Sequence, residues 1–173
     1  MLIDKRYFTG DLYIPNLTSS GAGVSEFVSK SNELVLNKLI VKHEKSFLEK
    51  VLGKEMASLF LTEIKKTPVE EKWNILKCHI VDQENLLSPL ANYVYYWYLR
   101  NQITETAGVG EVITQTNNAV IVSPVEKMVR AWNEMIDNVH DIVMHVNANK
   151  RDFTCFNPDY KSDVFFKINS MGL

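Results

Sequence analysis

The four histidines are the first residues to test for metal chemistry: His43, His79, His140 and His145. Two ligands on one helix share a face at a spacing of three or four residues, whereas His140 and His145 are five apart. Asp137 and His140 have the spacing of a carboxylate-bridged two-metal motif, but such sites need a second copy of the motif and further acids. The sequence holds no second copy. We therefore predict no metal site.

Local motifs of nucleophilic catalysis are also absent from the sequence. It has no G-x-S-x-G pattern, and Cys78 adjoins His79, so their side chains would point apart on a helix. Gly108 and Gly110 are followed by Ile113 where a dinucleotide-binding loop needs glycine, and they follow a predicted helix instead of a strand. We predict no catalytic residue and no cofactor, and we expect a protein that is not an enzyme.

The composition is that of a globular chain. It has 173 residues, a net charge of −2, 46% hydrophobic residues and 23% charged residues. The length fits one domain, 1–173, and the near-neutral charge gives no electrostatic reason to bind nucleic acid or an anionic membrane. Lysines are frequent between Lys38 and Lys54, but glutamates alternate with them at spacings that allow i, i+4 pairs. We interpret that stretch as a solvated helix face.

Targeting and redox signals are weak. Three of the first six residues are charged (Asp4, Lys5 and Arg6), and the start lacks the apolar centre of a signal peptide. The longest apolar run, 93–99, is far shorter than the roughly 20 residues that cross a bilayer. Cys78 and Cys155 form no CxxC pattern, so free thiols are the simplest interpretation. We expect a cytoplasmic protein without a membrane partner.

Hydrophobic periodicity predicts a mainly α-helical bundle of about four to five helices with a small β-hairpin. Residues 1–23 are predicted to be an extended arm that docks through Leu12, Ile14 and Leu17, and residues 24–149 are the helical core. Residues 150–173 form an irregular aromatic tail, which must dock on its own domain or on a neighbour.

The first predicted helix begins after Ser25 as N-cap and ends at Leu52, with Gly53 as its stop. Polar residues at 29–32 suggest a kink or a separate piece. His43 lies on the apolar face and is interpreted as a core or interface histidine. The members of that face recur at spacings of three or four: Leu36, Ile40, His43, Phe47 and Val51.

A second helix is predicted from Lys54 to about Lys66, and a short third piece follows Pro68, which would be its N-cap or first-turn residue. The residues predicted to face inward are Met56, Leu59, Phe60, Ile64, Trp73, Ile75, Leu76 and Ile80.

Two long helices begin with a serine followed by proline, at Ser88 and at Ser123. The first is apolar on all sides over 90–98 and should be buried all round as the axis of the core. The second runs to about Ala148. Its apolar stripe is predicted to comprise Val125, Met128, Val129, Trp132, Ile136, Val139, Val143 and Val146.

The segment 108–123 between these helices favours β structure. Strands 111–115 and 119–122, joined by a turn at Asn117 and Asn118, would form a protruding hairpin. Because two strands alone are marginal in water, we expect the hairpin to contact another subunit or another protein of an assembly. The alternative is a hairpin that folds down on the helices of its own chain. The predicted assembly contacts are Gly108, Gly110, Val112, Ile113, Asn117, Asn118, Val120 and Ile121.

Three stretches resemble a known family. Residues 44–56, EKSFLEKVLGKEM, are similar to a helix end of the form E-x-x-F-L-x-x-L-L-G. Residues 87–101 are similar to a helix that leads into a Thr/Gly-rich loop, and residues 127–135 contain the sequence AWNEM. Together they resemble the small helical head-completion, or head–tail connector, proteins of tailed phages and prophages.

The resemblance implies a structural adaptor that self-associates into a ring beneath a phage portal, in contact with the portal and a tail component. DNA would be only passing cargo, no small-molecule substrate is implied, and the protein would move from the bacterial cytoplasm into the virion. One alternative is a cytosolic helical protein-binding or regulatory module unrelated to phage. The other is an enzyme whose site no local motif reveals.

Overall fold

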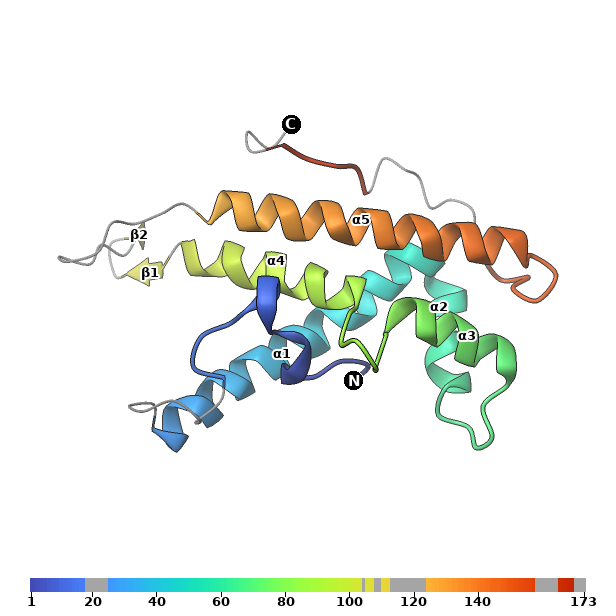
Figure 1. The fold of residues 1–173 in the computed structure, drawn as a ribbon, viewed down its shortest axis with the longest axis horizontal. Helices are drawn as coiled ribbons and strands as arrows, with labels where there is room; N and C mark the ends of the chain where they lie inside the picture. Colours follow the sequence, from blue (N-terminus) through green and yellow to red (C-terminus); the bar gives the residue numbers. More distant parts are fainter. Residues whose placement is uncertain (18–24, 104, 108–109, 113–123, 158–164, 170–173) are drawn as a thin grey trace.

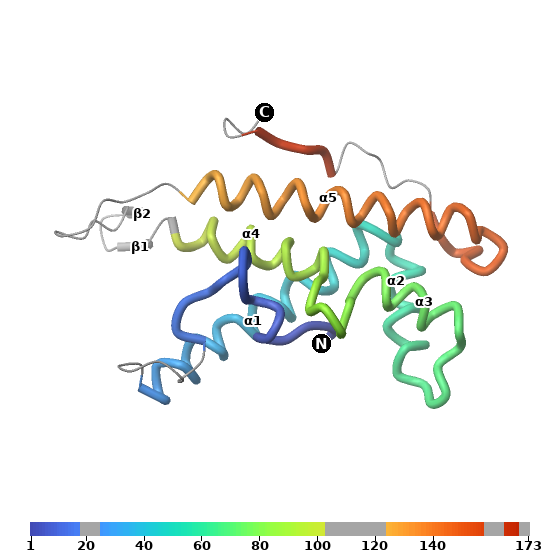
Figure 2. The backbone as a smooth tube through the Cα atoms, in the orientation of Figure 1, coloured from blue at the N-terminus to red at the C-terminus, as the bar shows by residue number. Residues whose placement is uncertain are grey.

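The computed structural model describes residues 1–17, 25–103, 105–107, 110–112, 124–157 and 165–169 (Figures 1 and 2). Its helices are α1 (Glu26–Leu52), α2 (Lys54–Glu63), α3 (Glu71–Ile80), α4 (Pro89–Ile103) and α5 (Val125–Ala148). Helices α4 and α5 pack side by side, α1 crosses beneath them, and α2 and α3 lie at one end (Figure 1). The predicted mainly α-helical fold is confirmed.

The N-terminal arm docks on the helices, but as two 3-10 turns and not as a strand. The turns are η1 (Lys5–Tyr7) and η2 (Gly10–Leu12). In η1 the Asp4 carboxylate accepts the Arg6 N–H at 2.8 Å, which closes the turn locally. The arm places a set of apolar side chains in the core: Ile3, Tyr7, Phe8, Ile14 and Leu17.

Helix α1 begins and ends as the sequence predicts. The Val28 N–H donates to the Ser25 side chain, and Gly53 follows the helix with a φ of 85°, a conformation that glycine adopts easily. The predicted break at 29–32 is wrong, because the helix is continuous. Its polar residues there bind the arm: the Ser29 hydroxyl donates to the Leu17 carbonyl at 3.0 Å and Asn32 to the Asn16 carbonyl.

The two short helices α2 and α3 pack at one end of the helical bundle. Phe60 packs against Trp73 and Trp73 against Phe153, which ties both helices to the start of the tail. Two predicted inward residues, Leu59 and Ile75, are instead exposed, because helices this short each bury only a narrow stripe. Pro68 lies outside α3, whose N-cap is Glu70.

The start of α4 is fixed by Ser88, as predicted. Its hydroxyl accepts the Leu90 N–H at 3.2 Å and donates to the Ile80 carbonyl at 2.8 Å, so one side chain joins the end of α3 to the start of α4. Residues 90–95 are buried, whereas 96–99 are only partly buried, so the expectation of burial all round holds for the first part of the helix alone.

The buried stripe of α5 differs from the predicted one. Ala131, Met135 and Ile142 are fully covered, whereas Trp132, Ile136 and Val143 are partly exposed at the edge. The stripe is rotated because α4 covers one side of α5 and the tail reaches the other. Trp132 donates its indole N–H to the Phe166 carbonyl at 3.0 Å.

The aromatic tail docks on its own chain, which resolves the choice left open by the sequence. Phe153, Phe156 and Phe165 are buried. The Asn133 side chain pairs with the Ile168 backbone, donating to its carbonyl and accepting its N–H, both at 2.9 Å. This pair of bonds holds residues 165–169 against α5.

The predicted hairpin over 108–123 is not supported. The ladder that the structure describes is shorter and earlier, with β1 (Glu105–Ala107) antiparallel to β2 (Gly110–Val112). Ala107 and Gly110 face each other across two residues, which is the commonest connection length of an antiparallel hairpin. The turn expected at Asn117 and Asn118 lies outside the described residues. Within the described part of the chain, no helix is long and apolar enough to cross a membrane.

Candidate assembly surface

The predicted assembly contacts are only partly described. Gly110 lies opposite Ala107 and Val112 lies opposite Glu105 in the short ladder. The remaining predicted contacts lie outside the described residues: Gly108, Ile113, Asn117, Asn118, Val120 and Ile121. The ladder extends from the end of α4, at one extreme of the molecule (Figure 1).

A different surface stands out among the described residues: an exposed apolar stripe on the first half of α1. Phe27 is 82% exposed, and Leu34 and Val41 are each 62% exposed. They are seven residues apart, nearly two helical turns, so they lie on one side of the helix. Val28 and Val35, at 41% and 49%, lie beside them. We call these five residues the α1 stripe.

The α1 stripe is exposed to solvent because it is the opposite face of α1 that packs into the core. Leu36, Ile40 and Phe47 are buried against α4 and the arm. The first half of α1 is therefore apolar on two faces, of which the fold covers one. Scattered exposed hydrophobic residues are ordinary, but several aligned on one helix face mark a contact surface.

Lysines accompany the stripe. Lys38, Lys42 and Lys45 are all exposed and fall within the same side of α1 as Leu34 and Val41. Lys45 lies 3.7 Å from Glu49. Lys38 and Lys42 have no ion-pair partner among the described residues. The sequence prediction of a charge-paired, solvated face is therefore incomplete, because the helix geometry leaves these two lysines beside apolar side chains.

On the inner side of α1, His43 takes the core position predicted for it. It is 6% exposed and contacts the rings of Tyr93 and Trp97 on α4. Burial lowers the pKa of His43, and the positive charges of Lys42 and Lys50 lower it further. The Lys50 ammonium donates to the Tyr93 hydroxyl at 3.0 Å. These contacts fix how α1 and α4 are oriented and thereby how the stripe is presented.

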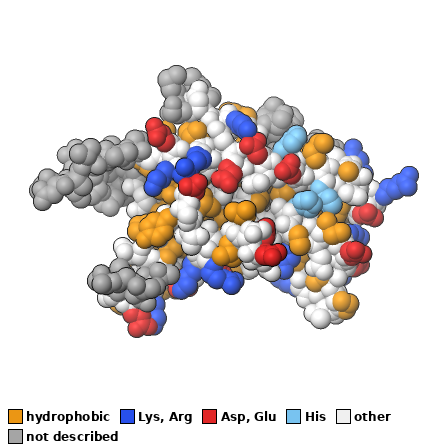
Figure 3. Space-filling model, in the orientation of Figure 1, with side chains coloured by type: hydrophobic (Ala, Val, Ile, Leu, Met, Phe, Trp, Pro, Cys, Tyr) orange, Lys and Arg blue, Asp and Glu red, His pale blue; other side chains and the backbone are white. Residues whose placement is uncertain are grey.

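The fold brings together two histidines whose positions in the sequence did not predict a contact. His79 on α3 and His145 on α5 have ring centroids 4.3 Å apart. Burial lowers the pKa of His145, and the neighbouring His79 lowers it further. Histidine side chains, pale blue in Figure 3, lie on the surface over this end of the molecule. Within the described residues no group of three or more metal-ligating side chains is close enough to hold an ion.

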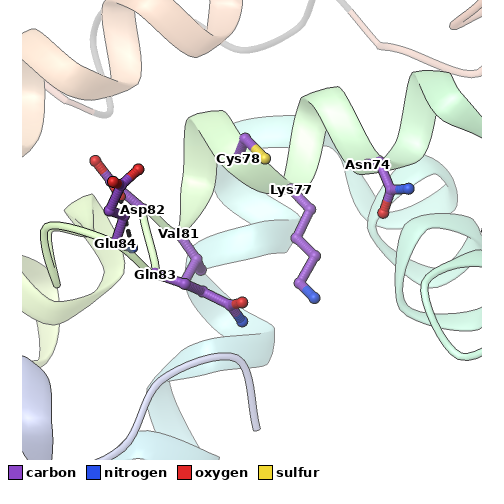
Figure 4. Close-up of a pocket in the computed structure, with 7 residues that line it drawn as sticks. All are labelled: Asn74, Lys77, Cys78, Val81, Asp82, Gln83 and Glu84. Atoms are coloured by element: carbon purple, nitrogen blue, oxygen red, sulfur yellow. Dashed lines mark hydrogen bonds between the residues drawn. The ribbon is translucent and has the colours of Figure 1, made fainter.

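A surface pocket of about 520 Å³ lies beside α3 (Figure 4). Cys78 and Lys77 contribute to its wall, and Asp82 stands at its rim. The labelled side chains do not converge on one point in Figure 4. The Asp82 carboxylate accepts hydrogen bonds from the backbone N–H groups of Asn85 and Glu84, each at 2.9 Å. These hydrogen bonds lower the pKa of Asp82. The pocket therefore does not present the convergent acid, base and nucleophile that acyl or phosphoryl transfer needs.

Comparison of the chain with protein-family models, curated proteins and solved structures found no match. The spacing of the α1 stripe was a signal in the sequence that could have revealed this surface. Phe27, Leu34 and Val41 recur every seven residues. Because the core face of the same helix recurs with a similar period, sequence pattern alone does not say which of the two faces is covered.

Proposed function

We propose that the protein is a non-enzymatic assembly subunit, a head–tail adaptor of the phage type that forms a ring and bridges portal and tail. The observation that carries the proposal is the α1 stripe, an aligned apolar surface that the fold leaves uncovered. The resemblance of residues 44–56, 87–101 and 127–135 to head–tail connector proteins supplies the kind of assembly.

The energetics suit a repeated contact. Covering a large apolar side chain completely contributes about 1.5–3 kcal/mol, so five partly exposed ones contribute roughly 5–9 kcal/mol. Association costs about 4–15 kcal/mol in lost freedom of motion. The net free energy of a single contact is thus near zero. A closed ring gives every subunit two such contacts, and a preformed portal can act as a template for the assembly.

The segment 108–123 is the second contact in this proposal. We assign it to a neighbouring subunit or the portal, because its β-favouring residues can pair with another strand. Partners in this arrangement are further copies of the chain, the portal and a tail component. The subunit is made in the bacterial cytoplasm and enters the virion, with DNA passing through the ring.

Light scattering and native mass spectrometry of the purified protein, alone and with portal, test the proposal. The wild type should form one closed oligomer or bind the portal. The double variant Phe27→Ser/Leu34→Ser should lose that assembly and keep its helical circular dichroism, since both side chains are exposed. Leu87→Ser is the matched control, because Leu87 is 60% exposed but lies far from the stripe in the chain.

A wild-type protein that remains a monomer and ignores the portal would contradict the proposal. It would then favour the cytosolic binding module, for which the same stripe would receive a different protein. Portal, capsid and tail genes beside the gene for this chain would support the adaptor.

A further inference from the structure

The outward side of α5 has a character opposite to that of the α1 stripe. Glu134, Asp137 and Asp141 are exposed on one side of the helix, with Met144 also outward and 58% exposed. We call these four residues the α5 face. Phe166 of the docked tail lies alongside, 56% exposed. Figure 3 shows acidic side chains over this part of the surface, with basic ones between them.

The charge on the α5 face is only partly neutralised by its own chain. Asp137 pairs with Lys167 at 2.7 Å. Glu134 and Asp141 have no ion-pair partner among the described residues. The α1 stripe has unpaired charges of the other sign, because Lys38 and Lys42 lie beside Leu34 and Val41 without an ion-pair partner among the described residues. The α5 face is thus mainly acidic with one exposed apolar side chain, whereas the α1 stripe is apolar with basic side chains beside it, so the charges of the two surfaces have opposite sign.

The two surfaces also lie on different sides of the molecule. Helix α5 runs along one long edge, and the first turns of α1 lie at the opposite edge (Figures 1 and 2). They cannot meet within one chain. A contact between them requires two copies, and because it joins unlike surfaces it repeats head to tail, which generates a ring if the rotation closes.

We propose that the α1 stripe and its lysines on one copy bind the α5 face of the next copy. This inference rests on the proposed ring and names the surfaces that build it. Pairing of the stripe with a second stripe is disfavoured, because it would bring together Lys38 and Lys42 of both copies, which have no ion-pair partner among the described residues. Pairing with the α5 face places carboxylates opposite ammonium groups and Met144 beside the stripe.

Charge reversal tests the pairing. The variants Lys38→Glu/Lys42→Glu and Glu134→Lys/Asp141→Lys should each raise the dissociation constant for self-association by at least about tenfold, since each juxtaposes like charges. An equimolar mixture of the two variants should assemble again, because every contact in an alternating ring is then complementary. The matched control Lys54→Glu/Lys65→Glu makes the same charge change at exposed lysines of the α2 region and should assemble as the wild type does.

Crosslinking gives a second readout that does not need a stable ring. In chains with Cys78 and Cys155 replaced by serine, Leu34→Cys and Met144→Cys variants are mixed at high concentration with a short bismaleimide. The expected product is a heterodimer of the two variants, with little homodimer of either.

The outcomes separate the two proposals. Wild-type protein that assembles while the mixture of charge variants is not restored and no heterodimer forms would overturn this interface and leave the ring standing. Leu34→Cys homodimers as the main product would show stripe-on-stripe pairing and also overturn it. Wild-type protein that is monomeric at every concentration and yields no crosslink would overturn both the ring and the interface.

Discussion

The imidazole of His43 lies parallel to the indole of Trp97, with 5.4 Å between the ring centroids and 7° between the planes. Nε2 of His43 and Nε1 of Trp97 are both buried and have no hydrogen-bond partner among the described residues. Burial and the charges of Lys42 and Lys50 disfavour the imidazolium, so the contact between α1 and α4 is built around a neutral ring.

This contact predicts a loss of stability in mild acid. The pKa of His43 is lowered in the folded protein. As the pH falls below about 6.5, His43 therefore becomes protonated in the unfolded state while it stays neutral in the folded state. The contribution of His43 to the free energy of unfolding should therefore be fully present above that pH and decrease below it, by at most about 1.4 kcal/mol per pH unit, until the folded pKa is reached. Urea unfolding at several pH values measures it.

The matched variants are His43→Phe and His140→Gln. The phenylalanine keeps the ring stack and removes the titration, so the decrease below pH 6.5 should become shallower. His140 is exposed on α5, and its replacement is the control for removing a histidine from the protein surface. An unaltered profile in His43→Phe would show that the acid sensitivity arises elsewhere.

Truncation of the α4 aromatics should rank them by burial. Tyr93 is 1% exposed and contacts Phe47, Trp132 and Phe165, so Tyr93→Ala should lower the free energy of unfolding by about 3–5 kcal/mol. Trp97 is only partly buried, and its truncation should cost less. Tyr13, 61% exposed, serves as the control and should change stability by less than about 0.5 kcal/mol. A Trp97 variant less stable than the Tyr93 variant would contradict this ranking.

The end of the tail around Ile168 should loosen when Asn133 is replaced. Asn133→Ala removes both hydrogen bonds to Ile168, and limited trypsin digestion should then cut after Lys167 several times faster. Asn138→Ala is the control, on the same helix and without a side-chain hydrogen bond to the described part of the tail, residues 150–157 and 165–169. The melting temperature should fall only slightly, because Phe165 remains available to the core. Equal digestion of both variants would show that the two bonds do not hold the tail.

Replacing residues 110–119 with a short Gly/Ser linker tests the second proposed contact. The helical circular dichroism and melting temperature should stay near those of the wild type, because α4 and α5 pack against each other independently of this segment. Ring formation or portal binding should be lost. A variant that unfolds, or one that assembles normally, would count against a role for the segment in assembly.

The sequence predicted those features that depend on local chemistry. Ser25, Gly53 and Ser88 mark helix ends through their own backbone bonds, and the structure places the ends at those residues. The sequence could not predict which apolar helix faces are buried by other elements. Leu59 and Phe27 are as apolar as buried residues, yet they are exposed, because burial depends on which distant element packs against a helix face. The arm that receives Ser29 and the pairing of His79 with His145 are likewise properties of the assembled fold.

The two hydrogen bonds made by the Ser88 hydroxyl have a consequence for local unfolding of the protein. The hydroxyl holds the last carbonyl of α3 and the first amide of α4 together, so neither helix end can fray without releasing the other. The backbone amides of the two ends should therefore exchange their hydrogens with solvent in one cooperative event, at similar rates. In the Ser88→Ala protein the two sets of amides should exchange independently, with the end of α3 becoming the faster.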